Sequence, residues 1–297
     1  MEFLTSWDIR VTIDLFLGGI GIGAFLLSVL ASLYDRNRYF STVKLAAVIA
    51  PVCVGLGLLA LITKLGVPLR GITTLWHVNF QSVMTIGVFL QTGFMIVSVV
   101  YAFFVFAQTR EFDRRLRAVQ GLGCFFAITV GLYHGLFLSS LGRVLWTEMI
   151  PGIFLISSLA TGVAAVMLIQ ALNGDTAILN DRSPARISYP AILLGLLAVQ
   201  FLSVLLWQFF TGRLELEQSV SYAQFMERFG PAWNWLVMIL GIVVPAILAA
   251  FFLVRTKGIM GRGAALVLAV LILAGAFTLK HLMIMGGQLV VPLQILS

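Results

Sequence analysis

The 297-residue chain is strongly apolar, with 60% hydrophobic and only 10% charged residues. Soluble domains carry roughly 25% charged residues, so the composition excludes a water-soluble globular protein and indicates lipid as the solvent. The formal net charge of +7 does not indicate nucleic-acid binding, because the basic residues lie in short loops between apolar runs.

Apolar runs long enough to cross a bilayer as helices of about 20 residues recur along the whole chain. We predict spans near 11–33, 43–63, 80–107, 117–140, 150–172, 190–211, 232–254 and 263–285. The expected fold is an all-α integral membrane protein with eight transmembrane helices in two four-helix bundles, at 1–145 and 146–297. The first run is read as a retained helix, since Glu2, Asp8 and Arg10 precede it where a signal peptide has a basic cluster.

Basic residues favour one side of the predicted membrane protein. Twelve lie after the odd-numbered spans: Arg36, Arg38, Lys44, Arg110, Arg114, Arg115, Arg117, Arg182, Arg186, Arg255, Lys257 and Arg262. Seven lie toward the other side: Arg10, Lys64, Arg70, Arg143, Arg213, Arg228 and Lys280. Cytoplasmic loops carry the excess of Lys and Arg. We therefore predict a multi-pass protein of the bacterial cytoplasmic (inner) membrane with both termini periplasmic.

Two local patterns bear on how the helices pack. Gly19 and Gly23 are four residues apart, as are Ser158 and Gly162, and small residues at this spacing let helix backbones approach closely. The outer connection at 212–231 contains a short interfacial helix near 222–228. Trp207, Trp233 and Trp235 flank it, as the aromatic belt of a membrane interface does.

Ionisable residues inside spans are the first candidates for function, because a carboxylate at the bilayer centre costs roughly 2.5–3.5 kcal/mol. Asp14 is the one acid clearly within a span, and Tyr133 and His134 lie near the outer end of the fourth. At about 1.5 Å per residue, these positions share a similar depth. Each residue alone also fits an interfacial, capping or snorkelling role; the shared depth favours a joint site. The same outer layer holds His77, Asn79 and Arg143.

The second half carries fewer such residues. Lys280 and His281 lie in the outer part of the last span, where they form a second polar site or a contact to a partner. Gln91 and Gln200 lie mid-span, and we expect each to bond a neighbouring helix rather than to move protons. No series of buried acids crosses the membrane, so the sequence indicates no proton-pumping relay.

The cysteine and histidine counts limit the redox groups that this protein can hold. Cys53 and Cys124 cannot supply the four thiolates of an iron–sulfur cluster, and both are expected to be packing residues. A single bis-histidine haem needs two facing imidazoles, and His77 is expected too close to the membrane surface to pair with His134. We therefore expect no haem, no cluster and no metal site in this protein.

Four segments together resemble the membrane subunits of the NrfD/polysulfide-reductase family. They are DLFLGGIGIGAF at 14–25, GLYHGLFLSS at 131–140, PGIFLISSLATG at 151–162, preceded by Trp146, and MGGQ at 285–288. The glycine-rich segment alone is weak, whereas the ordered set is fairly specific and spans the whole sequence.

The resemblance implies a haem-free subunit that oxidises menaquinol or ubiquinol, or in some members reduces quinone. Electrons pass to a ferredoxin-like iron–sulfur subunit and through it to a catalytic subunit, either a molybdopterin enzyme or a multihaem cytochrome. The protein is then the quinone-reactive part of an oxidoreductase of anaerobic respiration, and it does not act alone on the terminal substrate.

The resemblance also suggests site residues. The family's quinone-binding positions correspond to Asp14 and Tyr133, but the residue after the tyrosine is often threonine or another small polar residue and is here His134. Whether Tyr133, His134 or both contact quinone therefore stays open. Quinol oxidation releases two protons, which Asp14 or His134 can accept as general bases. His77 joins the expected quinone-binding set; the supporting residues are Asn79, Arg143, Lys280 and His281.

Two other functions fit the sequence. A transporter or channel is compatible with eight helices and an outward polar pocket, but Pro51 and Pro245 interrupt helices that do not correspond in the two halves. A redox-inactive membrane anchor is the other alternative.

Overall fold

A computed structural model describes residues 7–64, 83–107, 113–175, 179, 187–213 and 216–289. The described part is helical: α1 (Ile9–Asp35), α2 (Phe40–Lys64), α4 (Val83–Ala107), α5 (Asp113–Ser139), α6 (Ile150–Leu172), α7 (Tyr189–Thr211), α8 (Leu216–Ala232), the π-helical segment η2 (Trp233–Val243), α9 (Val244–Arg255) and α10 (Arg262–Gly286). Within it, eight helical units are long and apolar enough to cross a membrane, α8, η2 and α9 forming one of them. The prediction of an all-helical, eight-span protein is confirmed.

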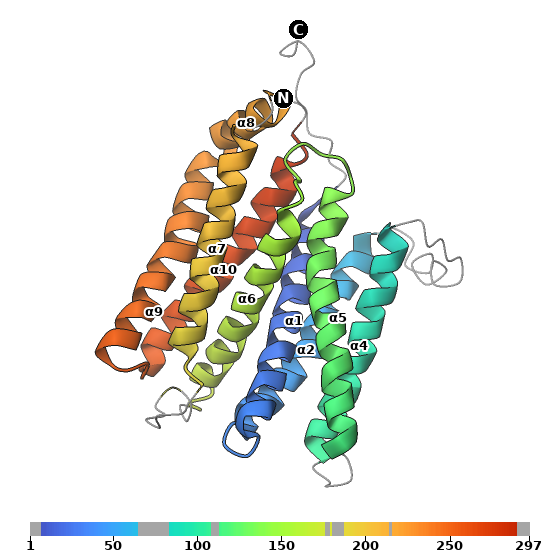
Figure 1. Cartoon of the computed structure of the whole chain (residues 1–297), viewed down its shortest axis with the longest axis vertical. Coiled ribbons are helices and arrows are strands. Elements are labelled where there is room, and N and C mark those ends of the chain that lie inside the picture. Colours follow the sequence, from blue (N-terminus) through green and yellow to red (C-terminus); the bar gives the residue numbers. More distant parts are fainter. Residues whose placement is uncertain are drawn as a thin grey trace.

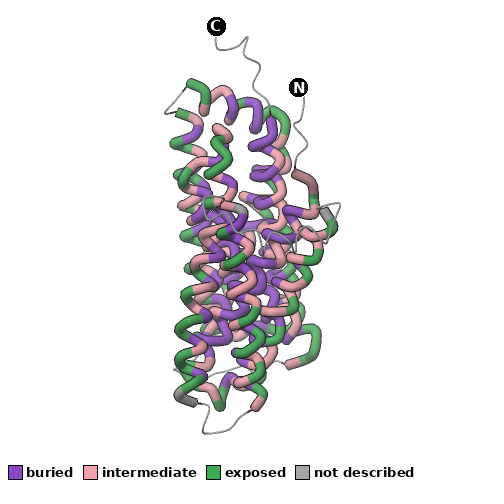
Figure 2. The backbone as a smooth tube through the Cα atoms, turned by 90° about the vertical axis from the view of Figure 1, so that its right-hand side faces the viewer, coloured by how far each residue is buried: buried purple, intermediate pink, exposed green. Residues whose placement is uncertain are grey.

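The helices run side by side, with α1 and α6 in the middle of the array (Figure 1). In these two helices 72% and 67% of the most apolar stretch is buried, against 28–44% in the other six. A helix that is apolar all round needs neighbours on every side, and α1 packs against α2, α5, α6 and α10. Exposed residues follow the outside of the array (Figure 2). Many of them are large and apolar, as a lipid-facing surface requires.

The predicted small-residue pairs lie at the contact between α1 and α6. A Cβ added to Gly23 would overlap the Ser158 carbonyl oxygen, and one added to Gly162 would overlap the backbone of Gly23. The two backbones therefore touch, as the four-residue spacing predicts. A second contact of this kind joins Gly241 of η2 to Gly275 of α10.

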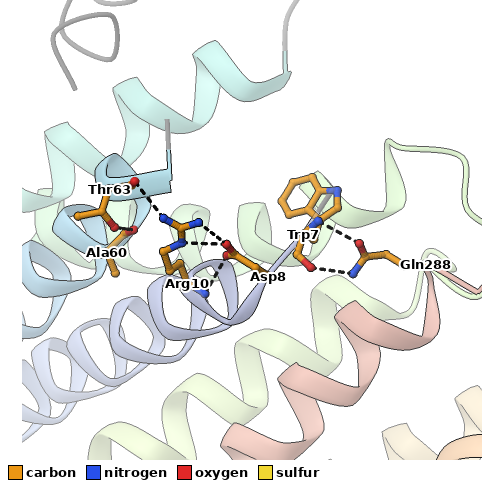
Figure 3. Close-up of polar contacts among 6 residues, drawn as sticks. All are labelled: Trp7, Asp8, Arg10, Ala60, Thr63 and Gln288. Atoms are coloured by element: carbon orange, nitrogen blue, oxygen red, sulfur yellow. Dashed lines mark hydrogen bonds and ion pairs between the residues drawn. The ribbon is translucent and has the colours of Figure 1, made fainter. Parts of the chain in front are cut away.

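The two ends of the described sequence meet at one end of the array, which we call the Trp7 end. The Trp7 backbone N–H donates to Gln288 Oε1 (2.9 Å), and Gln288 Nε2 donates back to the Trp7 carbonyl (3.1 Å) (Figure 3). Arg10 forms an ion pair with Asp8 (2.6 Å) and donates to the carbonyl oxygen of Thr63 at the end of α2 (3.0 Å). These bonds fix the start of α1 to both α2 and α10.

The predicted short helix near 222–228 is confirmed as part of α8. The backbone bends sharply after this helix. The evidence is that the ring centroids of Phe225 and Trp233 lie 5.3 Å apart, whereas eight residues of straight helix rise about 12 Å. Pro231 and the π-helical turns of η2 mark this bend, and π-turns are a common cause of helix distortion.

Two expectations about individual residues are wrong. Trp207 and Trp233 do not form an interfacial belt: both are fully buried, with ring centroids 5.5 Å apart, because α8 folds over them. Trp235, in contrast, is 63% exposed. Pro51 does not interrupt its span either, since α2 continues through it.

Candidate functional site

A buried carboxyl group lies in the second turn of α1. Asp14 is 4% exposed, and Gln91 Nε2 of α4 donates a hydrogen bond to its Oδ1 (3.2 Å). Gly57 of α2 packs against the same oxygen, where an added Cβ would lie 3.0 Å away. Three helices thus enclose the carboxyl and remove it from lipid, and the amide partly replaces the lost hydration.

A buried imidazole lies beside this pair. His134 of α5 is 1% exposed, yet neither ring nitrogen has a hydrogen-bond partner among the described residues. Its ring faces Gly18, one helical turn along α1 from Asp14: a Cβ added there would lie 2.8 Å from His134 Cε1 and 3.9 Å from Gln91 Nε2. Since buried polar groups are normally bonded, this imidazole is available to a ligand or a proton.

Tyr133 precedes His134 and occupies a more open position. Its half-buried ring stacks on Phe137, with centroids 5.9 Å apart, and presses against Gly87 of α4. Its hydroxyl makes no hydrogen bond to any described residue, whereas the carboxyl of Asp14 is near enough to interact with it electrostatically. The hydroxyl is therefore available to a ligand that approaches from outside the helix array.

A buried lysine completes the arrangement. Lys280 of α10 is 0% exposed, and its Nζ donates to the Leu15 carbonyl (2.8 Å) and to Ser158 Oγ (3.2 Å). It interacts electrostatically with both Asp14 and His134. We call Asp14, Gln91, His134 and Lys280 the polar cluster. From the sequence, we expected Lys280 to belong to a second polar site or to contact a partner. In the structure it packs against α1 and α6.

The other predicted site residues lie outside the polar cluster. His281 Nδ1 is 3.1 Å from Thr12 Oγ1, and its ring stacks on Phe277. Arg143 lies on the connection between α5 and α6 and is half-buried. His77 and Asn79 fall outside the described residues.

Gln91 is the site residue that sequence reasoning underestimated. It bonds a neighbouring helix, as expected, but its partner is the carboxyl of Asp14. The available signal was an isolated amide in an otherwise apolar run. Gly18 and Gly57 also shape the site, and both are small residues opposite large polar ones.

The chemistry of the polar cluster follows from its composition. It combines a carboxyl, an imidazole and an ammonium group in an interior from which water is largely excluded. Such groups exchange protons and hydrogen-bond to ligand oxygens, and their electrostatic interactions are stronger than in water. No group of three or more potential metal ligands occurs among the residues that the structure describes.

Fold and site together define a polytopic helical membrane protein with a buried cluster of ionisable side chains near one end. The family comparison makes this class more specific. The model of the family described as "Polysulphide reductase, NrfD" matches residues 1–292, so the chain belongs to this family and the resemblance noted from the sequence is confirmed.

Individual relatives agree in class while differing in coverage. The C subunit of polysulfide reductase of Wolinella succinogenes is 29% identical over 185 residues, 56% of this protein and 58% of that subunit. Protein NrfD homolog of Haemophilus influenzae is 25% identical over 314 residues, 96% of this protein and 95% of the relative. The integral membrane subunit of menaquinone reductase of Nitratidesulfovibrio vulgaris is 26% identical over 131 residues, 44% of this protein and 31% of that subunit.

These relatives are bacterial, and two are named as parts of larger oxidoreductases. Family membership and the eight apolar helices indicate a multi-pass integral membrane protein of the inner membrane. The match spans only 58% of the length of the polysulfide reductase subunit.

Proposed function

We propose that this protein is the quinone-reactive membrane subunit of a respiratory oxidoreductase and that it oxidises quinol. Family membership supports a redox role within a complex. Two relatives carry the substrate class in their names, the menaquinone reductase integral membrane subunit and the Hdr-like menaquinol oxidoreductase integral membrane subunit of Archaeoglobus fulgidus. The substrate would be menaquinol or ubiquinol.

The observation that carries this proposal is the unbonded imidazole of His134 next to the Asp14–Gln91 pair. A purely structural anchor gains nothing from a buried imidazole without partners, since such a group destabilises the fold. A quinol hydroxyl is a donor from which either ring nitrogen can accept a hydrogen bond.

We assign roles from position. Tyr133, which is half-buried with an unbonded hydroxyl, hydrogen-bonds a quinol oxygen. His134 and Asp14, deeper in the array, receive protons as general bases. Lys280 compensates the negative charge of Asp14, and Gln91 orients its carboxyl. His77 and Asn79 remain predicted contributors from outside the described residues.

The reaction balances as quinol to quinone with release of two protons and two electrons. The protons leave toward the Trp7 end, which we assign to the periplasm from the Lys and Arg distribution. The electrons pass to a cluster of a docked ferredoxin-like iron–sulfur subunit, and from there to a molybdopterin or multihaem catalytic subunit. The half at 1–145 then supplies most of the site, and the half at 146–297 contributes Lys280.

The test is quinol oxidation by the complex purified in mild detergent with its native partners, in the wild type and in the variants Asp14→Asn and Tyr133→Phe. In Asp14→Asn, the loss of a general base should lower the rate of quinol oxidation about 10²-fold or more. Loss of one hydrogen bond should lower it about tenfold in Tyr133→Phe. Tyr101→Phe is the matched control, because Tyr101 is buried in the same half and bonds Ser28 (3.0 Å) away from the cluster.

Two results would overturn the proposal. Full quinol oxidation by both variants would favour the alternative function, a redox-inactive membrane anchor. Purification of a stable protein with neither an iron–sulfur partner nor quinone would favour the transporter.

A further inference from the structure

The connection between α5 and α6, residues 140–149, is a fixed platform at the Trp7 end. Trp146 Nε1 donates to the Met283 carbonyl (2.8 Å), and Trp207 Nε1 donates to the Leu145 carbonyl (3.4 Å). Ser139 Oγ donates to the Thr147 carbonyl (3.1 Å). Side chains carried by this connection are therefore held in place relative to α7 and α10.

A hollow of about 550 Å³ opens between this platform and the end of α7. We call it the Arg143 recess; its walls include Arg143, Thr147, Glu148, Phe210 and Thr211. It is large enough for a lipid headgroup, and it lies where the apolar surfaces of α5 and α7 end.

The recess holds one positive and one negative side chain, and neither is neutralised within the described part of the protein. Arg143 and Glu148 form no ion pair with each other, and neither side chain hydrogen-bonds to a described residue. An arginine and a glutamate held five residues apart on a fixed platform offer opposite charges to a ligand rather than to each other. This pattern is complementary to a zwitterion.

Buried hydroxyl groups in the same recess are also unsatisfied by the residues that the structure describes. Thr211 is 1% exposed, and its Oγ1 has no hydrogen-bond partner; Thr147 Oγ1 has none either. Two such hydroxyls are destabilising unless a ligand or water bonds them.

The apolar surroundings of the recess indicate what the rest of the ligand is. Leu206 and Phe210 of α7 and Leu141 after α5 are exposed large apolar side chains next to it. Acyl chains can lie along these surfaces while a headgroup occupies the recess. A protein partner would not require apolar surface that continues down the membrane-spanning helices.

We propose that the Arg143 recess binds a phospholipid with a zwitterionic phosphoethanolamine headgroup. Arg143 and the hydroxyl of Thr211 receive the phosphate, and Glu148 receives the ammonium group. An anionic headgroup would gain the contact with Arg143 but would meet the carboxylate of Glu148 without a counter-charge.

The test is native mass spectrometry of the complex with its native partners, purified in mild detergent. The complex is incubated with equal amounts of phosphatidylethanolamine and phosphatidylglycerol that share the same acyl chains. The wild type should retain phosphatidylethanolamine in preference. Arg143→Gln should lower retention of both lipids roughly tenfold, since a charge-assisted hydrogen bond is lost. Glu148→Gln should abolish the preference, and Thr211→Val should lower retention several-fold without changing a charge.

The controls are Arg255→Gln and Glu217→Gln, which change exposed charges outside the recess and should leave lipid binding unchanged. The proposal fails if the wild type holds both lipids equally or neither of them. It also fails if Arg143→Gln releases a partner subunit while lipid retention stays the same, since the recess would then be a protein interface.

Discussion

The two halves of the molecule each bury one glutamine in mid-span, and the two amides are treated differently. Gln91 in the first half donates to Asp14 (3.2 Å). Gln200 in the second half is 3% exposed, and neither its nitrogen nor its oxygen has a partner among the described residues. The same side chain in two similar apolar helices is therefore hydrogen-bonded in one case and unbonded in the other.

The surroundings explain the difference. Gln91 meets the carboxyl group of Asp14, which lies on α1. Gln200 faces a cavity of about 20 Å³, whose walls include Ser157, Gly241 and Gly275, and the hydroxyl of Ser157 is also unbonded within the described part. That space can hold one water molecule. The amide of Gln91 is thus held by another side chain, whereas the amide of Gln200 lies beside a space with room for solvent. Chemistry is therefore expected at the polar cluster, which includes Gln91, and not around Gln200.

The largest effect is expected from Lys280→Met. Met fills similar space but removes the ammonium group that interacts with Asp14 and donates to the Leu15 carbonyl and Ser158 Oγ; each hydrogen bond to a charged group contributes about 1.5–3 kcal/mol. We expect a large loss of thermal stability and of quinol oxidation. The double variant Asp14→Asn/Lys280→Met should recover much of the stability but not the activity. Additive losses of stability in this double-mutant cycle would show that the two residues are not coupled.

The next effect is expected from Gln91→Leu. The substitution removes the amide that donates to Asp14, so the carboxyl loses a hydrogen bond of about 1.5–3 kcal/mol. Quinol oxidation should fall about tenfold, with the protein still folded by gel filtration in detergent. An unchanged rate would mean that orientation of the carboxyl by Gln91 is unimportant.

A packing change in the second half should act on stability alone. In Gly275→Ala the new methyl group meets the backbone of Gly241, and overpacking of this kind costs about 1–3 kcal/mol. The melting temperature should fall, while quinol oxidation per folded complex stays within about twofold of the wild type. A selective loss of activity would contradict the assignment of chemistry to the polar cluster.

The smallest effect is expected from Gln200→Leu. The unpaired amide is replaced by an apolar side chain of similar volume, so stability should be unchanged or slightly higher, and quinol oxidation should be unaffected. It is the matched partner of Gln91→Leu, and equal losses of activity in the two variants would show that the two glutamines do not differ in function.

The sequence predicted the spans and their packing well, because both depend on local composition. The eight spans differ from the observed helices mainly at their ends, and the glycine pairs of α1 and α6 meet as expected. His134 lies against Gly18, one helical turn along α1 from Asp14, and their joint role stays a prediction.

What the sequence missed depends on how each helix is turned about its axis. Helices that are apolar on all sides give no amphipathic signal for rotation. The bond from Gln91 to Asp14 and the contact of Lys280 with Leu15 could therefore not be derived. The burial of Trp207 and Trp233 was missed for a related reason, since it requires the bend between α8 and η2.

The bonds between Trp7 and Gln288 and between Leu15 and Lys280 have a consequence for biosynthesis. A nascent polypeptide emerges from its N-terminus first, so α1 enters the membrane early although several of its contacts come from α6 and α10. Until α10 is made, Asp14 lacks the charge that compensates it. Helix α1 is thus made before α10 but is fully enclosed only once α10 is present, and a polypeptide truncated before Lys280 should leave part of α1 without its neighbour.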